Sequence, residues 1–147
     1  MKYKDLRKLF IAGMVVNFLS VAVPALSYFL FRGVFELEPH SIWKWHPQDP
    51  FVGLTPNYVL VLVVINTLLA LYFAFLYYAL RKSLPDKGSV RGIRFGLLIY
   101  PVSVLIPIYS LFVLLNIAPA ALVYFAIEGL IEFVLYGAAV GNILDKD

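Results

Sequence analysis

The sequence predicts an all-α, polytopic integral membrane protein: a four-helix bundle with both termini in the cytoplasm. Three observations lead to this prediction, namely the composition, four long apolar runs and the distribution of lysine and arginine. Apolar residues make up 62% of the 147-residue chain and charged residues only 14%, against about 45–50% and about 25% in ordinary soluble domains. A soluble domain of this length has too much surface to hide so many apolar side chains.

Four segments are long and apolar enough to cross the ~30 Å hydrocarbon core, which takes about 20 helical residues. They cover residues 9–31, 57–80, 94–115 and 118–144 of a single domain that occupies the whole chain, 1–147. Their length and their lack of strand-like alternation favour helices over barrel strands. The first run follows a basic N-terminus, as a secretory signal does, but it is too long for a signal core. We therefore expect it to be retained as a span.

Turn and cap residues mark the ends of the spans. Pro56 stands at the first position of the second span, where no amide donor is needed. Residues 85–88 predict a turn, after which Ser89 is available to cap the third span. The connection between the third and fourth spans is only a few residues long, so these two spans are predicted to be antiparallel neighbours.

Pro101 and Pro107 interrupt the third span, because each removes a helix hydrogen bond and bends the axis. A passive kink is common in membrane helices. Broken helices also line the binding sites of transporters near the middle of the membrane. Both interpretations remain open.

The basic residues predict the orientation. Ten of the twelve lysines and arginines lie in the N-terminal segment, between the second and third spans, or in the tail. Only Arg32 and Lys44 lie in the loop of residues 32–56. By the positive-inside rule both termini are cytoplasmic and this loop is external. The expected location is the cell membrane, and the pattern fits a prokaryotic inner membrane.

Glu128 and Glu132 are the most informative residues of the sequence. They lie four residues apart, so they share one face of a helix, and they fall near the middle of the fourth span. An acidic side chain at the centre of a membrane helix costs about 2.5–3.5 kcal/mol. We therefore expect both to face protein, water or an ion rather than lipid. Arg94 is predicted to lie ~18 Å from Glu132 along the helix axis, too far for an ion pair.

Polar residues of the other spans fall at the same predicted depth: Asn17 and Ser20 in the first, Asn66 in the second and Ser103 in the third. With the glutamates they predict a polar layer that binds a proton, a cation or a polar ligand. Two carboxylates on one face titrate as a coupled pair, which could hold one proton and exchange it for a cation. The alternative is that these residues only join helices, each hydrogen bond contributing about 0.6–2 kcal/mol.

Glycines predict where helices pack closely. Gly88, Gly92 and Gly96 recur every four residues at the start of the third span, and Gly137 and Gly141 do so near the end of the fourth. Small residues at this spacing let helix backbones approach each other. At 100° per residue the last two lie roughly opposite the glutamate face. Packing within one chain and packing between two copies both remain open.

The external loop holds His40 and His46 near three carboxylates, a combination that could bind zinc or another transition metal. Their spacing matches no established ligand motif, so we expect a solvated polar loop and no metal or cofactor. The chain has no cysteine, which excludes thiolate sites and disulfides. It has no basic stripe with interleaved aromatic residues, so nucleic acid is not an expected partner.

The stretch KGSVRGIRFG, residues 87–96, precedes a proline-containing span and a last span that ends in glycines. This half of the chain resembles small four-span prokaryotic membrane proteins that carry only domain-of-unknown-function labels. That resemblance implies a fold but no activity. The four spans and the intramembrane glutamates are also similar to small multidrug-resistance transporters, whose essential glutamate lies in the first span of a shorter chain. By analogy this implies exchange of protons against a cationic substrate.

Two functions remain open. The first is a small transporter or channel-like protein with Glu128 and Glu132 as a proton- or cation-coupled site. The second is a non-catalytic membrane subunit, whose glutamates and glycines contact a larger partner. We do not expect an enzyme, since the sequence holds no recognisable nucleophile–base pair. The expected partners are the lipid bilayer and either further copies of the chain or another membrane subunit.

Overall fold

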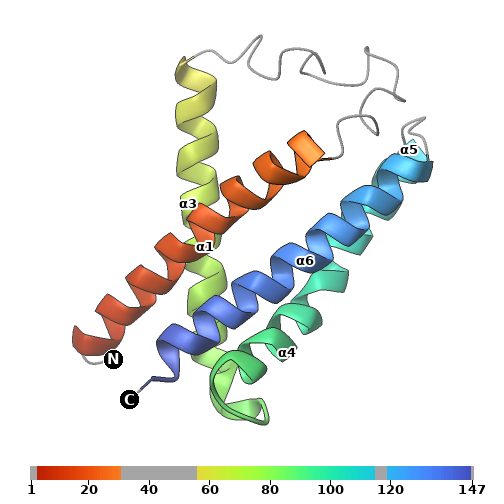
Figure 1. The fold of residues 1–147 in the computed structure, drawn as a ribbon. Coiled ribbons are helices and arrows are strands. Elements are labelled where there is room, and N and C mark those ends of the chain that lie inside the picture. The colour runs from red at the N-terminus through yellow and green to blue at the C-terminus, as the bar shows by residue number, and fades with distance from the viewer. Residues whose placement is uncertain (1–2, 31–55, 115–118, 147) are drawn as a thin grey trace.

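The computed structural model describes residues 3–30, 56–114 and 119–146, and all regular elements within these ranges are helical. The α-helices are α1 Tyr3–Leu30, α3 Pro56–Leu80, α4 Gly88–Tyr100, α5 Ile106–Leu114 and α6 Pro119–Leu144 (Figure 1). A 3₁₀ turn, η1 Arg81–Ser83, follows α3, and a π-helical segment, η2 Pro101–Leu105, joins α4 to α5. Four helical stretches in the described ranges are long and apolar enough to span a membrane. This confirms the all-α class with four apolar helices.

Two of the helices begin earlier than the apolar runs predict. Helix α1 begins at Tyr3 rather than at residue 9, and α4 begins at Gly88 rather than at residue 94. Both additional segments are less apolar than the spans: the first contains Lys4, Arg7 and Lys8, and the second contains two glycines, Ser89 and Arg91. Hydropathy marks only the part of a helix that lies in hydrocarbon, whereas the backbone hydrogen bonds of a helix continue into the polar region. The other two spans begin at Pro56 and Pro119, each within one residue of the prediction.

The start of α4 differs from the prediction that Ser89 caps it. The helix already begins at Gly88, and Lys87 at the cap position makes no side-chain cap. Asp86 and Gly88 both have positive φ angles, 67° and 60°, in the left-handed region that glycine adopts without strain. The Gly88 amide donates a hydrogen bond to Asp145 Oδ2 at 2.9 Å. The cap of α4 is therefore supplied by the other end of the chain.

The third span changes helix type at its first proline. Pro101 has no amide hydrogen to donate to the preceding turn, and the chain widens there into the π-helical segment η2. Helix α5 then resumes, with Pro107 near its start. The predicted interruption is thus seen at Pro101, while Pro107 lies within α5, and the span consists of α4, η2 and α5 in succession.

A seam of glycines joins α4 to α6. A Cβ atom added to Gly92 would overlap the carbonyl oxygen of Gly137, and one added to Gly137 would overlap the carbonyl oxygen of Gly92. The Gly88 carbonyl lies equally close to Gly141, and Gly96 meets the backbone of α6 one turn further along. All five predicted packing glycines thus lie along one seam within the chain, where the two helix backbones are in direct contact.

Helix α1 lies between α3 and α6 and packs against both, while α4 packs chiefly against α6. The N-terminus, the C-terminus and the connection from α3 to α4 all lie at one end of the bundle (Figure 1). We call this the termini end. The glycine seam begins here, where the Gly88 carbonyl contacts Gly141.

Aromatic rings fill the core in the half of the bundle nearer the termini end. Tyr77 and Phe95 are completely buried, with ring centroids 5.4 Å apart. Phe73 packs against Phe95 at 5.1 Å and against Tyr136 at 6.0 Å. Phe133 closes the cluster at 5.7 Å from Phe73. These rings separate the polar side chains in the middle of the bundle from those at the termini end.

A buried carboxylate at the termini end ties the helices together. Asp145 Oδ2 accepts hydrogen bonds from the Tyr77 hydroxyl at 3.0 Å, from the Gly88 amide and from Arg91 NH1 at 3.0 Å. Arg81 NH1 lies 3.7 Å from Asp145 Oδ1. The side chain of Asp145 is only 6% exposed. One carboxylate thus connects the end of α6 to α3, η1 and α4.

Removing this carboxylate is expected to destabilise the protein strongly. Asp145→Ala removes the acceptor of the Gly88 amide and of Arg91 and the counter-charge of Arg81, and loss of one partner of a buried pair costs about 3–5 kcal/mol. The matched control is Asp86→Asn, because Asp86 is 37% exposed and, among the described residues, pairs with Arg94. Asparagine tolerates the left-handed backbone of this position, so loss of the surface ion pair costs less than about 1 kcal/mol. Unfolding in mixed micelles, followed by circular dichroism, measures both. Equal losses of unfolding free energy would contradict the role given to Asp145.

Candidate intramembrane carboxylate site

A polar stripe runs along the face of α6 that packs against α1. It consists of Tyr124, Glu128, Glu132 and Tyr136, which recur every four residues and therefore lie one above another on the helix. Both glutamates are half-buried, and Tyr136 is buried. At 1.5 Å per residue the stripe extends ~18 Å along the helix axis, which is more than half the thickness of the hydrocarbon core.

Glu128 is held at the end of the stripe away from the termini. The Tyr124 hydroxyl donates a hydrogen bond to Glu128 Oε1 at 3.1 Å. The same hydroxyl lies 2.5 Å from Ser27 Oγ of α1. Since a tyrosine hydroxyl has one proton, the serine hydroxyl is the donor to Tyr124 when Tyr124 donates to the carboxylate. A serine, a tyrosine and a glutamate therefore form a hydrogen-bonded chain from α1 to α6.

Glu132 likewise has a tyrosine neighbour on α6, one turn nearer the termini end. The Tyr136 side chain lies close to the Glu132 carboxylate and to Ser20 of α1. Glu128 and Glu132 lie near enough to each other to interact electrostatically. Each carboxylate thus has a tyrosine partner on its own helix and a serine of α1 beyond it.

Helix α3 joins the site through Asn66. Its Nδ2 donates to Asn17 Oδ1 at 2.7 Å and lies 2.6 Å from Ser20 Oγ. The Ser20 hydroxyl lies 2.8 Å from the Asn17 carbonyl oxygen, its acceptor on α1. Ser20 therefore links the amide pair of α1 and α3 to Tyr136 of α6, so three spans contribute to one connected set of polar side chains.

Ser103 of the third span lies apart from this set. Its side chain is exposed, in the π-helical segment η2. The third span instead reaches α6 through the Tyr100 hydroxyl, which donates to the Ala126 carbonyl oxygen at 2.8 Å. The structure thus brings together Glu128, Glu132, Asn17 and Asn66, but not Ser103. Depth in the membrane can be read from sequence position, whereas the side on which a residue lies depends on how the π-helical turn rotates the chain.

The basic residues of the described segments do not neutralise the glutamates. Arg94, which was predicted not to reach Glu132, forms its salt bridge with Asp86 at 2.8 Å. Neither glutamate has a salt-bridge partner among residues 3–30, 56–114 and 119–146. Two carboxylates with hydroxyl partners and no counter-charge can take up a proton or a cation.

The metal prediction concerns residues that the structure does not describe. His40 and His46 lie outside the described ranges. Within those ranges no group of three histidine, cysteine, aspartate or glutamate residues is placed to hold a metal ion. The oxygen atoms of the stripe come instead from carboxylates, hydroxyls and amides, which suit a proton or a hard or organic cation.

Sequence reasoning missed Tyr124, Tyr136 and Ser27. The signal for the tyrosines is in the sequence, since Tyr–Glu–Glu–Tyr at a constant spacing of four residues marks a single helix face. Ser27 could not be found in this way, because its role depends on which face of α1 packs against α6. The chain matches no protein-family model, no curated protein and no solved structure in the comparisons made. The function proposed next therefore rests on the residues of this site.

Proposed function

We propose that the protein is a small transporter or channel-like protein in which Glu128 and Glu132 take up protons or cations within the membrane. The observation that supports this most is the stripe of two carboxylates between two tyrosines, which faces α1 and has no basic partner among the residues that the structure describes. Ionisable groups at this depth are costly to insert. Interhelical hydrogen bonding alone does not need two acids, because serine and asparagine provide it at lower cost.

The proposed chemistry is exchange at a coupled pair. Two carboxylates four residues apart repel each other when both are charged, so the pair favours one shared proton. A cation that enters the stripe replaces this proton and takes its place between the carboxylate oxygens. Tyr124 and Tyr136 stabilise the charged form by donating hydrogen bonds, and the released proton passes to water at the membrane face to which the stripe is then open.

Passage to the termini end requires a conformational change. The rings of Phe73 and Phe133 pack against Tyr136, and Phe95 packs against Phe73. These apolar rings stand between the stripe and the polar groups of the termini end. We therefore expect α1 or α3 to move against α6 so that the stripe reaches the two membrane faces alternately. A transporter with one accessible face at a time works in this way.

The proposal includes an orientation. Both termini and the connection from α3 to α4 lie at one end of the bundle, and these segments carry ten of the twelve basic residues. By the positive-inside rule this end of the bundle lies on the cytoplasmic side of the cell membrane. A reporter fused to the C-terminus that is active only in the cytoplasm tests this orientation.

The experiment that tests the function is proton flux in reconstituted vesicles. The purified protein is placed in vesicles that enclose a pH-sensitive dye, and inorganic and organic cations are added outside in turn. At least one cation is expected to drive proton efflux that empty vesicles do not show and that the Glu128→Gln, Glu132→Gln double variant has lost. Flux that persists in a correctly folded double variant would remove the proposal.

The second candidate, a membrane subunit, is favoured by one feature of α3. Every residue from 59 to 65 is exposed, for example Leu60 at 63% and Val63 at 54%. A helix inside a bundle normally buries one face, whereas these two turns contact little of the part of the chain that the structure describes. Purification in mild detergent tests this candidate: a stoichiometric partner protein supports it, and a lone monomer with full flux removes it.

A further inference from the structure

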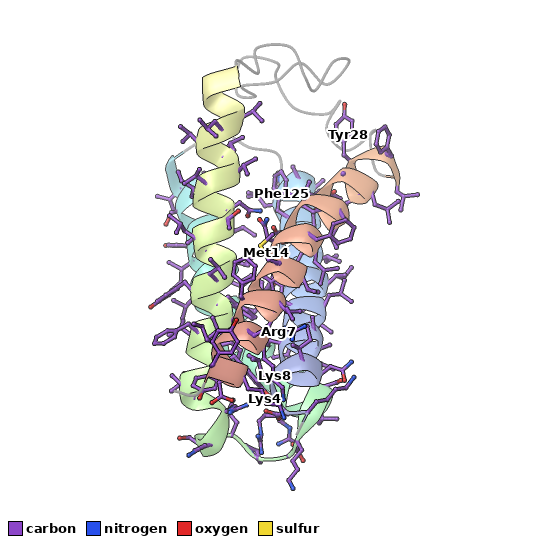
Figure 2. All side chains as sticks on the ribbon, turned by 90° about the vertical axis from the view of Figure 1, so that its left-hand side faces the viewer. Lys4, Arg7, Lys8, Met14, Tyr28 and Phe125 are labelled. Carbon is purple, nitrogen blue, oxygen red and sulfur yellow. The ribbon has the colours of Figure 1, made fainter. Side chains whose placement is uncertain are left out.

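A pocket of about 390 Å³ opens at the termini end of the bundle. Its walls come from four parts of the chain: the first turns of α1, the turn η1, the start of α4 and the C-terminal segment after α6. Figure 2 shows Lys4 and Lys8 on the first turns of α1 at this end. Residues up to 142 positions apart in the sequence, Lys4 and Lys146, therefore line one pocket.

The pocket is strongly positive. Seven of its ten lining residues are lysine or arginine, and the two acidic ones are Asp5 and Asp145. The balance of seven positive and two negative charges gives +5, which exceeds the net charge of +3 for the whole chain. The positive-inside rule explains why basic residues gather on one side of the membrane. It does not explain why they converge on one cavity.

The acidic side chains of the pocket are already engaged. Asp145 binds Arg81 and Arg91, and Asp5 accepts a hydrogen bond from the Tyr78 hydroxyl at 3.3 Å. Lys82 and Lys87, by contrast, make no salt bridge to any residue in the described ranges. The pocket thus has more cationic donors than acceptors.

Arg91 illustrates this shortage of acceptors. Its NH1 group binds Asp145, while its buried Nε has no hydrogen-bond partner among the described residues. Buried donors are normally paired. An anion with several oxygen atoms would supply the hydrogen-bond acceptors and the negative charge that this end of the bundle lacks.

We propose that this pocket binds a phosphate-bearing anion, in the form presented by the headgroup of an anionic phospholipid. The lining residues stand where the apolar helices end, at Ser83, Gly88 and Leu144, which is the depth of the headgroup region. Lysine and arginine bind phosphate oxygens through charge-assisted hydrogen bonds. Clusters of basic residues next to membrane helices recognise anionic headgroups in the same way.

The test compares two pairs of substitutions that remove equal charge. Lys82→Gln with Lys87→Gln alters the pocket, and Arg7→Gln with Arg94→Gln is the matched control outside it. All four side chains are exposed, so both variants are expected to fold. Binding of phosphatidylglycerol to the full-length protein in detergent is measured by native mass spectrometry, with phosphatidylcholine as the uncharged reference and inorganic phosphate as competitor.

The pocket pair is expected to weaken phosphatidylglycerol binding about tenfold or more, at about 1 kcal/mol for each basic residue near a headgroup, and the control pair by less than about twofold. Failure of inorganic phosphate to compete identifies the lipid as the source of the phosphate. Full competition supports the same pocket with free phosphate as ligand. Equal weakening by both pairs, or no preference for phosphatidylglycerol over phosphatidylcholine, overturns the proposal.

Discussion

The Glu132→Gln variant is expected to lower cation-driven proton flux by on the order of a hundredfold, the usual effect of removing a positioned proton carrier. Glutamine has nearly the same shape and can still accept a hydrogen bond from Tyr136, but it cannot exchange a proton. Glu128→Gln is expected to have a smaller effect. Glu132 is nearer to the aromatic cluster, so a proton that crosses the bundle must leave the stripe from this side.

Two further variants separate chemistry from packing. Glu132→Asp keeps a carboxylate and is expected to retain part of the flux, because only the reach of the side chain changes. Ser20→Ala removes the hydroxyl that joins α1 to Asn66 of α3 and lies close to Tyr136 of α6, whereas Ser103→Ala removes the same hydroxyl from an exposed position. A Ser103→Ala variant with the same loss as Ser20→Ala would show that the connected polar set plays no part in the flux.

Substitution of a seam glycine is expected to destabilise the protein strongly. A Cβ atom at position 137 would overlap the backbone carbonyl of Gly92, and a backbone cannot rotate away as a side chain can. Overpacking costs about 1–3 kcal/mol where side chains can adjust, so Gly137→Ala is expected to lose about 3 kcal/mol or more of unfolding free energy. Titration from a mild detergent into sodium dodecyl sulfate, followed by loss of helical signal, measures this.

Gly129→Ala is the matched control on the same helix. Its Cβ would lie 2.7 Å from a methyl group of Val104, which can move by changing the rotamer or by a small shift. The expected loss is below about 1.5 kcal/mol. If both alanine variants unfold at the same detergent composition, the direct backbone contact between α4 and α6 does not hold the bundle together.

The fold was largely predictable from the sequence, because the insertion of helices depends on the length of apolar runs. The positions of Pro56 and Pro119 fixed two helix starts within one residue. The start of α4 could not be predicted in the same way. Its cap is Asp145, a residue 57 positions away from Gly88, and only the folded bundle brings the two together.

The candidate site was predictable in part. The free-energy cost of placing a carboxyl group in the membrane singles out Glu128 and Glu132. The predicted depth of residues in the membrane points to Asn17 and Asn66, and the structure joins these two by a hydrogen bond. Depth does not tell which side of a helix faces inward. The sequence therefore predicts Ser103 in the polar layer, whereas the structure places its side chain on the exposed surface. Ser27 was overlooked for the same cause.

The central claim is that carboxyl groups inside the membrane hold an exchangeable proton, and chemical labelling tests it most directly. A hydrophobic carbodiimide reacts with protonated carboxyl groups within the bilayer, and peptide mass spectrometry locates the product. We predict modification at Glu128 or Glu132, protection by a cation that drives flux, and little modification by a charged, water-soluble carbodiimide. No modification of either glutamate by the hydrophobic reagent, or equal modification by the water-soluble one, would contradict the claim.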